Sequence, residues 1–292
     1  MNTTLEARDL VKDFHTRSGL RRGRLRAVDH VSFTVPPGRT LGLVGESGSG
    51  KSTIARMVVR LEKPTAGRVV LRGPDGVPVP NGTYRNRVQM VFQDPFASLN
   101  PFHTVEHHLA RPLRLHGRAR DRQETHRLVA ELLDRVSLPA GEVVHRRPHE
   151  LSGGQRQRVA IARALAPGAN VIVADEPVSM LDVSIRLGIL RLLARLQREE
   201  NLAVLYITHD LATARHFSDD IIVLYRGRVV ERGPADDVIL DPQHPYTRLL
   251  AAASPDPLRP HQLIDADPDA VVAAATAAAF DHYTGRWEDH AQ

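Results

Sequence analysis

The sequence predicts an α/β protein with a mixed, mainly parallel sheet, an antiparallel β edge region and an inserted α-helical subdomain. Short apolar runs typical of strands alternate with segments of helical period, an order typical of parallel sheets. The strand signal vanishes over about 95–165, which predicts the helical insert. Residues 67–71, followed by the Gly- and Pro-rich stretch 73–82, form a hairpin-like pattern, which predicts the antiparallel edge region.

The individual elements follow from local patterns in chain order. The predicted strands are 40–44, 87–92, 171–174, 202–208 and 221–225. We expect a helix over 51–61 directly after the first strand, and a helix in the insert that begins after a cap at Asp121. Apolar side chains recur every three or four positions from Ile185 to Leu196, which predicts an amphipathic helix over 183–199 that packs on the sheet.

Composition limits the class of protein. The 292 residues are 42% hydrophobic and 25% charged, which suits a globular core. The longest apolar runs fall far short of the roughly 20 residues that cross a bilayer, and segment 1–13 lacks the apolar centre of a secretory signal. We therefore expect an intracellular chain without membrane spans. The absence of cysteine excludes disulfides, thiolate zinc sites and iron–sulfur ligation.

The net charge of +5 is unevenly distributed, because residues 254–292 are acidic and the rest of the chain is basic. Basic surfaces bind nucleic acid, anionic lipid or phosphorylated ligands. The arginine-rich stretch 17–26 has no interleaved aromatic platform, so we expect a solvated loop and no nucleic-acid partner. The expected division is a domain over 1–253 and an extension of unknown role over 254–292, with one possible helix at 270–280.

A phosphate-binding loop is predicted between the first strand and its helix. The pattern G-x-x-x-x-G-K-[ST] is matched by Gly45-Glu46-Ser47-Gly48-Ser49-Gly50-Lys51-Ser52, followed by Thr53. The glycines let backbone N–H groups converge on phosphate oxygens at a helix N-terminus. We expect Lys51 to reach the β- and γ-phosphates and Ser52 to offer its hydroxyl to Mg²⁺. A nucleoside triphosphate is the implied ligand.

Two carboxylates, Asp175 and Glu176, end the apolar run 171–174. We expect Asp175 to hold Mg²⁺, usually through water, and Glu176 to polarise a water for in-line attack on the γ-phosphorus. Adjacent acids that merely end a strand in solvent are the alternative. To this point a nucleotide hydrolase, a kinase and a GTP switch all stay open.

The run Leu151-Ser152-Gly153-Gly154-Gln155, continued by 156–165, is identified as the signature of ATP-binding-cassette (ABC) proteins. Ser152 and two glycines at a helix start form a second anion seat rich in N–H groups. In this family two cassettes pair head to tail, so that the signature of one closes on the γ-phosphate bound by the other. The resemblance implies the RecA-like fold of P-loop NTPases, ATP with Mg²⁺, and a second cassette, identical or similar, as partner.

Further residues match the family in order, over residues 5 to about 253. Gln93 resembles the glutamine that touches Mg²⁺ and the attacking water, and His209 resembles the histidine that contacts the γ-phosphate. Asp182 ends a loop, 179–182, that resembles the one crossing the dimer interface. Phe14 lies where the family places an aromatic ring against adenine. Taken singly, such a histidine is more often a surface residue and such a phenylalanine a core residue.

Two stretches resemble the dipeptide and oligopeptide importers within the family. Residues 93–101 resemble their extended glutamine loop, and 241–250, with His244-Pro245-Tyr246, resemble their C-terminal hallmark. In the family a coupling helix of the membrane subunit enters the insert, so 93–110 is the expected docking surface. For His244-Pro245-Tyr246 the alternative is a proline-capped helix start that merely packs. The cysteine cluster that many members of the branch carry is absent.

The resemblance implies an ATPase subunit at the cytoplasmic face of the cell membrane. Its implied partners are two permease subunits and an extracytoplasmic substrate-binding protein, with di- or oligopeptides as cargo. Oligosaccharide or nickel import is an alternative, as is a soluble ABC ATPase acting on DNA or ribosomes, although sustained heptads are absent. The two stretches argue against an exporter. His103 and His107 lie one helical turn apart, but Glu106 is the sole carboxylate nearby, so we expect no metal there.

Overall fold

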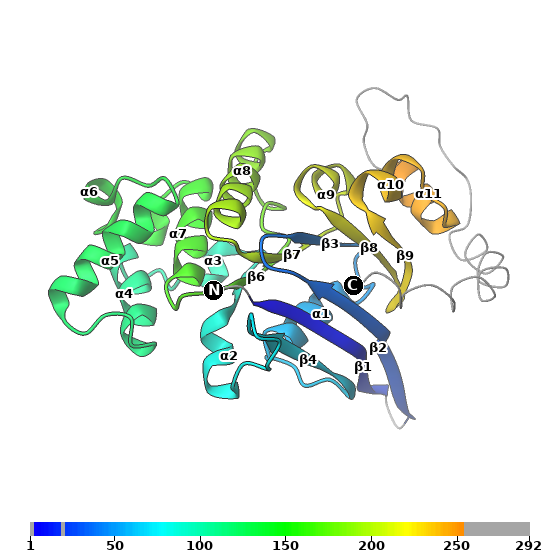
Figure 1. Cartoon of the computed structure of the whole chain (residues 1–292). Coiled ribbons are helices and arrows are strands. Elements are labelled where there is room, and N and C mark those ends of the chain that lie inside the picture. The colour runs from blue at the N-terminus through cyan, green and yellow to red at the C-terminus, as the bar shows by residue number, and fades with distance from the viewer. Residues whose placement is uncertain (1–2, 19–20, 254–292) are drawn as a thin grey trace.

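A six-stranded sheet forms the centre of the chain in a computed structural model that describes residues 3–18 and 21–253 (Figure 1). Its strand order is β5-β6-β7-β3-β8-β9, in which the first five strands run parallel and β9 pairs antiparallel with β8. The strands are β3 (Thr40–Val44), β5 (Val88–Val91), β6 (Val171–Asp175), β7 (Ala203–Thr208), β8 (Asp220–Tyr225) and β9 (Arg228–Pro234). The predicted mainly parallel sheet is confirmed.

A second sheet is antiparallel and has the order β2-β1-β4. Its strands are β1 (Thr4–Ser18), β2 (Arg21–Val35) and β4 (Ala66–Arg72). The antiparallel region is therefore confirmed, but its pairing differs from the prediction. The partner of β4 is β1, whereas the following stretch 73–82 returns through a single bridge between Arg72 and Pro78.

The solvated loop predicted over residues 17–26 is wrong, because the described part of this stretch belongs to the paired strands β1 and β2. Irregular pairing hides these strands from the sequence pattern. Asp9 and His30 have positive φ angles of 51° and 55°, and the register shifts between Ala7 and Leu10. Each shift interrupts the strict alternation of apolar and polar residues by which strands are recognised.

Helices cover both faces of the central sheet (Figure 1). The strand alternation sets this up, since Val171 and Val173 pack with α1 and the antiparallel sheet, whereas Ile172 and Ala174 pack with the helices on the other face. The helices outside the insert are α1 (Lys51–Val58), α2 (Asn81–Arg87), α8 (Val183–Glu199), α9 (Leu211–Phe217), α10 (Ala235–Leu240) and α11 (Pro245–Ala253). The predicted bounds of α8 are confirmed, and α1 ends earlier than expected.

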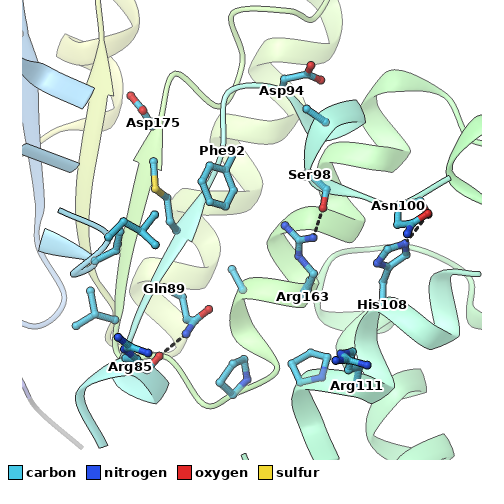
Figure 2. Close-up of a pocket in the computed structure, with 18 of the residues that line it drawn as sticks. Arg85, Gln89, Phe92, Asp94, Ser98, Asn100, His108, Arg111, Arg163 and Asp175 are labelled. Atoms are coloured by element: carbon cyan, nitrogen blue, oxygen red, sulfur yellow. Dashed lines mark hydrogen bonds between the residues drawn. The ribbon is translucent and has the colours of Figure 1, made fainter. Parts of the chain in front are cut away.

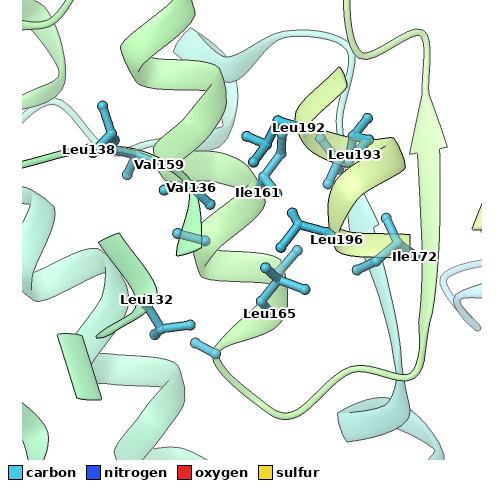
Figure 3. Packing of buried hydrophobic residues seen from close by; sticks show 14 of the residues in the cluster. Leu132, Val136, Leu138, Val159, Ile161, Leu165, Ile172, Leu192, Leu193 and Leu196 are labelled. Atoms are coloured by element: carbon cyan, nitrogen blue, oxygen red, sulfur yellow. The ribbon is translucent and has the colours of Figure 1, made fainter. Parts of the chain in front are cut away.

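The insert is entirely helical between β5 and β6. It contains α3 (Pro95–Ser98), α4 (Val105–Leu115), α5 (Arg122–Arg135), α6 (Ala140–Val143), a 3₁₀ turn at Pro148–Glu150 and α7 (Gly153–Leu165). Asp121 caps α5 as predicted, with its Oδ1 accepting from the Glu124 N–H at 2.8 Å. Figure 3 shows Val136, Ile161 and Leu196 in the cluster that joins α5, α7 and α8.

The expected helix at 270–280 and the expected absence of membrane spans both concern residues beyond those that the structure describes. The helix predicted at 270–280, within the 254–292 extension, lies outside the described residues. Within 3–18 and 21–253, the helices are too short or too polar to cross a bilayer.

Candidate nucleotide site

The predicted site residues gather where the parallel strands end. Gly45 directly follows β3, Glu176 follows β6, His209 follows β7, and Gln93 lies just beyond β5. The strand order β5-β6-β7-β3 brings these ends together along one edge of the sheet. In open α/β sheets this carboxyl edge is where ligands bind.

The loop between β3 and α1 depends on its glycines. Gly45, Gly48 and Gly50 have φ angles of 155°, 82° and 107°, which side-chain-bearing residues rarely adopt. A Cβ at Gly50 would lie 2.4 Å from the carbonyl oxygen of Ala27, so this backbone approach also requires glycine. No side chain caps the N-terminus of α1. The first N–H groups of the helix are therefore available to an anion.

Lys51 lies within the loop at the start of α1 and is 5% exposed. Its ammonium donates to the carbonyl oxygens of Gly45, at 2.6 Å, and Glu46, at 2.7 Å. Burial lowers the pKa of Lys51, and the negative charges of Glu176, Asp175 and Glu46 oppose that shift. The loop thus holds a cation at its centre with two carbonyl groups and a nearby acidic cluster.

Ser52 and Asp175 meet across the sheet edge, because α1 packs over β6. The Ser52 hydroxyl donates to Oδ1 of Asp175 at 3.3 Å. Asp175 is 8% exposed, and burial raises the pKa of its carboxyl group while the Ser52 hydrogen bond lowers it. A hydroxyl and a carboxylate at this spacing are oxygen ligands of the kind Mg²⁺ prefers, so the donor set fits the predicted ion.

The Glu176 carboxylate is held between two neighbouring strand ends. Its Oε2 accepts from Nε2 of Gln93 at 3.2 Å, and its Oε1 lies 3.2 Å from Nδ1 of His209. Glu176 has a φ of 45°, while its N–H still donates to the Ile207 carbonyl at 2.9 Å. This left-handed turn is costly for a residue other than glycine and occurs typically at functional sites. The structure thus brings together Gln93, Glu176 and His209.

The signature residues form the start of α7, away from the phosphate loop. Ser152 and Gln155 cap each other, with Ser152 Oγ accepting from the Gln155 N–H at 3.3 Å and Gln155 Oε1 accepting from the Ser152 N–H at 3.0 Å. At Gly154 a Cβ would lie 2.8 Å from Ile185 Cγ2, so α7 and α8 approach closely here, next to Gly153. Helix α7 packs against other insert helices, α8 and β5, whereas α1 packs on β2, β6 and β7.

The loop 179–182 joins the carboxylate cluster to α8. The Ser179 hydroxyl donates to the Glu176 carbonyl at 3.0 Å, Met180 is 58% exposed, and Asp182 is exposed at the N-cap of α8. Phe14 is half-buried on β1, with Nζ of Lys12 5.0 Å from its ring centroid. Its contact with adenine stays a prediction.

A cavity of about 1230 Å³ opens beside the site, between the sheet and the insert. Ser52, Gln93 and Asp175 line one end of it, and Figure 2 shows His108, Arg111 and Arg163 among the side chains farther along. The lining includes part of the predicted docking surface 93–110. The site and the expected docking surface are therefore parts of one continuous hollow.

Sequence patterns did not reveal one contact to the phosphate loop. The Glu46 N–H donates to the hydroxyl of Tyr246 at 3.2 Å, across 200 positions of sequence. The His244-Pro245-Tyr246 stretch was the available signal, but it was linked to the peptide-importer branch and not to the nucleotide site.

Comparisons with known proteins agree with this geometry. Residues 28–179 match the family model described as ABC transporter, and 230–279 match the model for the oligopeptide/dipeptide transporter C-terminal region. Among similar proteins, the oligopeptide transport ATP-binding protein AppF of Bacillus subtilis (strain 168) is 46% identical over 260 residues, covering 87% of this chain and 78% of that protein. The di/tripeptide transport ATP-binding protein DppF of Pseudomonas aeruginosa (strain UCBPP-PA14) is 44% identical over 269 residues, covering 89% and 83%.

Solved structures with a similar fold include nucleotide-bound cassettes. One is the dimeric, post-hydrolysis state of the ATP-binding cassette MJ0796 bound to ADP and Pi, with a TM-score of 0.67 and 30% identity. The match covers 79% of this chain and 98% of that chain. A second similar structure is cbiO1 from Clostridium perfringens, part of the ABC transporter complex cbiONQ, with a TM-score of 0.68, 25% identity, and 81% and 90% of the two chains covered.

Proposed function

Because the chain belongs to the ABC transporter family, we propose that it is the ATP-hydrolysing subunit of an importer for di- or oligopeptides. The observation that carries the choice of cargo is the match of residues 230–279 to the oligopeptide/dipeptide transporter C-terminal region. Relatives named for oligopeptide and di/tripeptide transport support it.

ATP hydrolysis follows from the groups at the sheet edge. Lys51 and the N–H groups at the start of α1 bind the phosphates. Glu176 accepts a proton from the attacking water, and Gln93 and His209 hold its carboxylate in place. The terminal phosphate is transferred to that water, giving ADP and inorganic phosphate.

Ser52, Asp175 and Gln93 are the residues that would hold Mg²⁺. The ion, when bound, would neutralise charge on the β- and γ-phosphates. The protein's own contribution is to place a hydroxyl and a buried carboxylate together, which the Ser52–Asp175 hydrogen bond does.

A second cassette completes the site in this proposal. The signature residues 152–155 lie at the start of α7, in the insert, whereas the phosphate loop leads into α1, which packs on β2, β6 and β7. Met180, in the loop before α8, and Val183 and Leu187, in its first turns, are 58%, 79% and 50% exposed, which suits a surface that a partner covers. The partner cassette's signature and the loop ending in Asp182 would close over ATP. The dimeric state of the similar cassette MJ0796, bound to ADP and Pi, supports the pairing of two cassettes.

The permease subunits are proposed to dock at the cavity that includes part of 93–110. Five arginines line it against two acidic side chains, Asp94 and Asp175, and burial lowers the pKa of His107 and His108, which keeps these two histidines neutral. The arginines are Arg56, Arg60, Arg85, Arg111 and Arg163. This charge favours a permease segment that carries carboxylates. Arg163 of α7 donates to the Ser98 carbonyl of α3, so the signature helix and the docking surface are joined directly.

Reversing the charge of this cavity should release the permease. Arg111→Glu is expected to lower co-purification with the permease pair at least severalfold, because a lining cation becomes an anion that repels carboxylates. Arg114→Glu is the matched control, since Arg114 is exposed on the same helix but does not line the cavity. Pull-down yields of the two variants, with thermal unfolding to verify folding, measure the effect. Equal yields would contradict docking here.

The transport function itself is tested in cells. Cells that contain the permease pair, the substrate-binding protein and this chain are expected to accumulate labelled tripeptide, and cells lacking only this chain are not. Labelled oligosaccharide and nickel, the alternative cargoes, are tested in parallel, and we expect the same cells not to accumulate them. We also expect the chain to fractionate with the membrane at its cytoplasmic face. Association with ribosomes or DNA, with none in the membrane fraction, would refute the importer.

A further inference from the structure

The His-Pro-Tyr stretch reaches the phosphate loop through Tyr246. This side chain lies in the first turn of α11, is fully buried, and packs against the ring of Tyr225 with centroids 4.4 Å apart. Its hydroxyl accepts a hydrogen bond from the N–H of Glu46 at 3.2 Å. Glu46 is the second residue of the loop, so a residue from the end of the described chain directly contacts the nucleotide site.

A buried carboxylate fixes the segment that carries Tyr246. Glu231 of β9 is 5% exposed, and its oxygens accept from the N–H groups of Gln243, at 2.7 Å, and His244, at 3.1 Å. His244 in turn caps α11, because its Nδ1 accepts from the Tyr246 N–H at 3.1 Å. Pro245 occupies the first helical position, where no N–H is needed. His244 and Pro245 therefore both help to fix the position of the Tyr246 side chain.

The anchored peptide is the one that positions Lys51. The Gly45–Glu46 peptide unit is planar, with the Glu46 N–H at one end and the Gly45 carbonyl at the other. Tyr246 holds the N–H, and the carbonyl oxygen accepts from the Lys51 ammonium at 2.6 Å. A shift of this peptide would therefore move the group that orients the ammonium.

We propose that Tyr246 is a positioning residue for ATP binding, which fixes the Gly45–Glu46 peptide and through it the Lys51 ammonium. The proposal rests on the proposed ATPase function. It makes the segment from Glu231 to Tyr246 part of the nucleotide site. Burial raises the pKa of Tyr246 to about 12, so its hydroxyl keeps its proton, and its role as a neutral acceptor, through the physiological pH range.

Tyr246→Phe in the full-length chain tests this role, because it keeps the ring that packs on Tyr225 and removes only the hydroxyl. We expect the KM and Kd for ATP to rise about 2- to 10-fold, as for the loss of one hydrogen bond, with kcat changing less than KM. Amide hydrogen exchange at Glu46 should become faster in the nucleotide-free protein. Glu231→Gln should shift KM in the same direction, because it weakens the same anchor.

Tyr84→Phe is the matched control. Tyr84 is also fully buried, and its hydroxyl donates to the Val58 carbonyl at 2.7 Å, at the opposite end of α1. We expect this variant to lower the melting temperature but to leave KM for ATP and exchange at Glu46 unchanged. Equal KM shifts in both tyrosine variants, or wild-type KM and exchange in Tyr246→Phe, would overturn the proposal. A wild-type chain that fails to bind ATP would instead overturn the proposed function and this inference with it.

Discussion

Glu176→Gln is expected to lower ATP turnover by about 10²- to 10⁴-fold while leaving ATP affinity near the wild-type value. Glutamine preserves the size of the side chain that lies between Gln93 and His209, but it lacks the negative charge that draws a proton from water. Lys51 and the first turn of α1, which we propose to bind the phosphates, are unchanged. Phosphate release and equilibrium binding of ATP measure the two effects separately.

The same variant should accumulate as an ATP-bound dimer, because in the proposed mechanism two cassettes close on ATP and part after hydrolysis. Size-exclusion chromatography with ATP and Mg²⁺ would detect it. Glu199→Gln is the control: this carboxylate lies at the far end of α8 and its side chain is 65% exposed, so wild-type turnover is expected. Turnover of Glu176→Gln within a fewfold of wild type would remove Glu176 as the base.

The main sheet and most of the candidate site could be predicted because their signals are local. The loop around Lys51 is a continuous motif, and Asp175 and Glu176 directly end an apolar strand. Gln93 and His209 are distant in sequence, but they also follow strands of a parallel sheet. Since the carboxyl ends of such strands share one edge, the fold class places them at the same edge as Glu176, and the resemblance to the ABC family supplied their expected roles.

The antiparallel sheet and the Tyr246 contact escaped prediction for a related reason. The pairing of β1 with β4 joins segments separated by more than one intervening element, and the left-handed residues Asp9 and His30 disturb the strand period. The hydrogen bond from Glu46 to Tyr246 depends on β8 lying beside β3, with β9 on its far side, and on the packing of Tyr246 with Val44 and Val223 in one cluster. Neither arrangement leaves a periodic pattern in one stretch of sequence.

Lys51→Ala should weaken ATP binding itself by at least about tenfold, since a hydrogen bond to a charged group contributes about 1.5–3 kcal/mol. Two further effects act in the same direction. The carbonyl groups of Gly45 and Glu46 would lose the ammonium that donates to them. In the wild-type chain the negative charges of Asp175 and Glu176 raise the Lys51 pKa against the effect of burial. Without the ammonium, these negative charges would repel the phosphates of ATP with no cation beside them. Equilibrium titration with ATP measures the change.

Lys63→Ala separates this local effect from the change in net charge. Lys63 is exposed in the turn between α1 and β4, so its removal subtracts the same charge from the chain without disturbing the loop. We expect its ATP affinity to match the wild-type value, because the field of an exposed charge is screened by salt over about 10 Å. If Lys51→Ala bound ATP as tightly as Lys63→Ala, the buried ammonium would not be a phosphate ligand, and the backbone N–H groups at the start of α1 would have to hold the nucleotide alone.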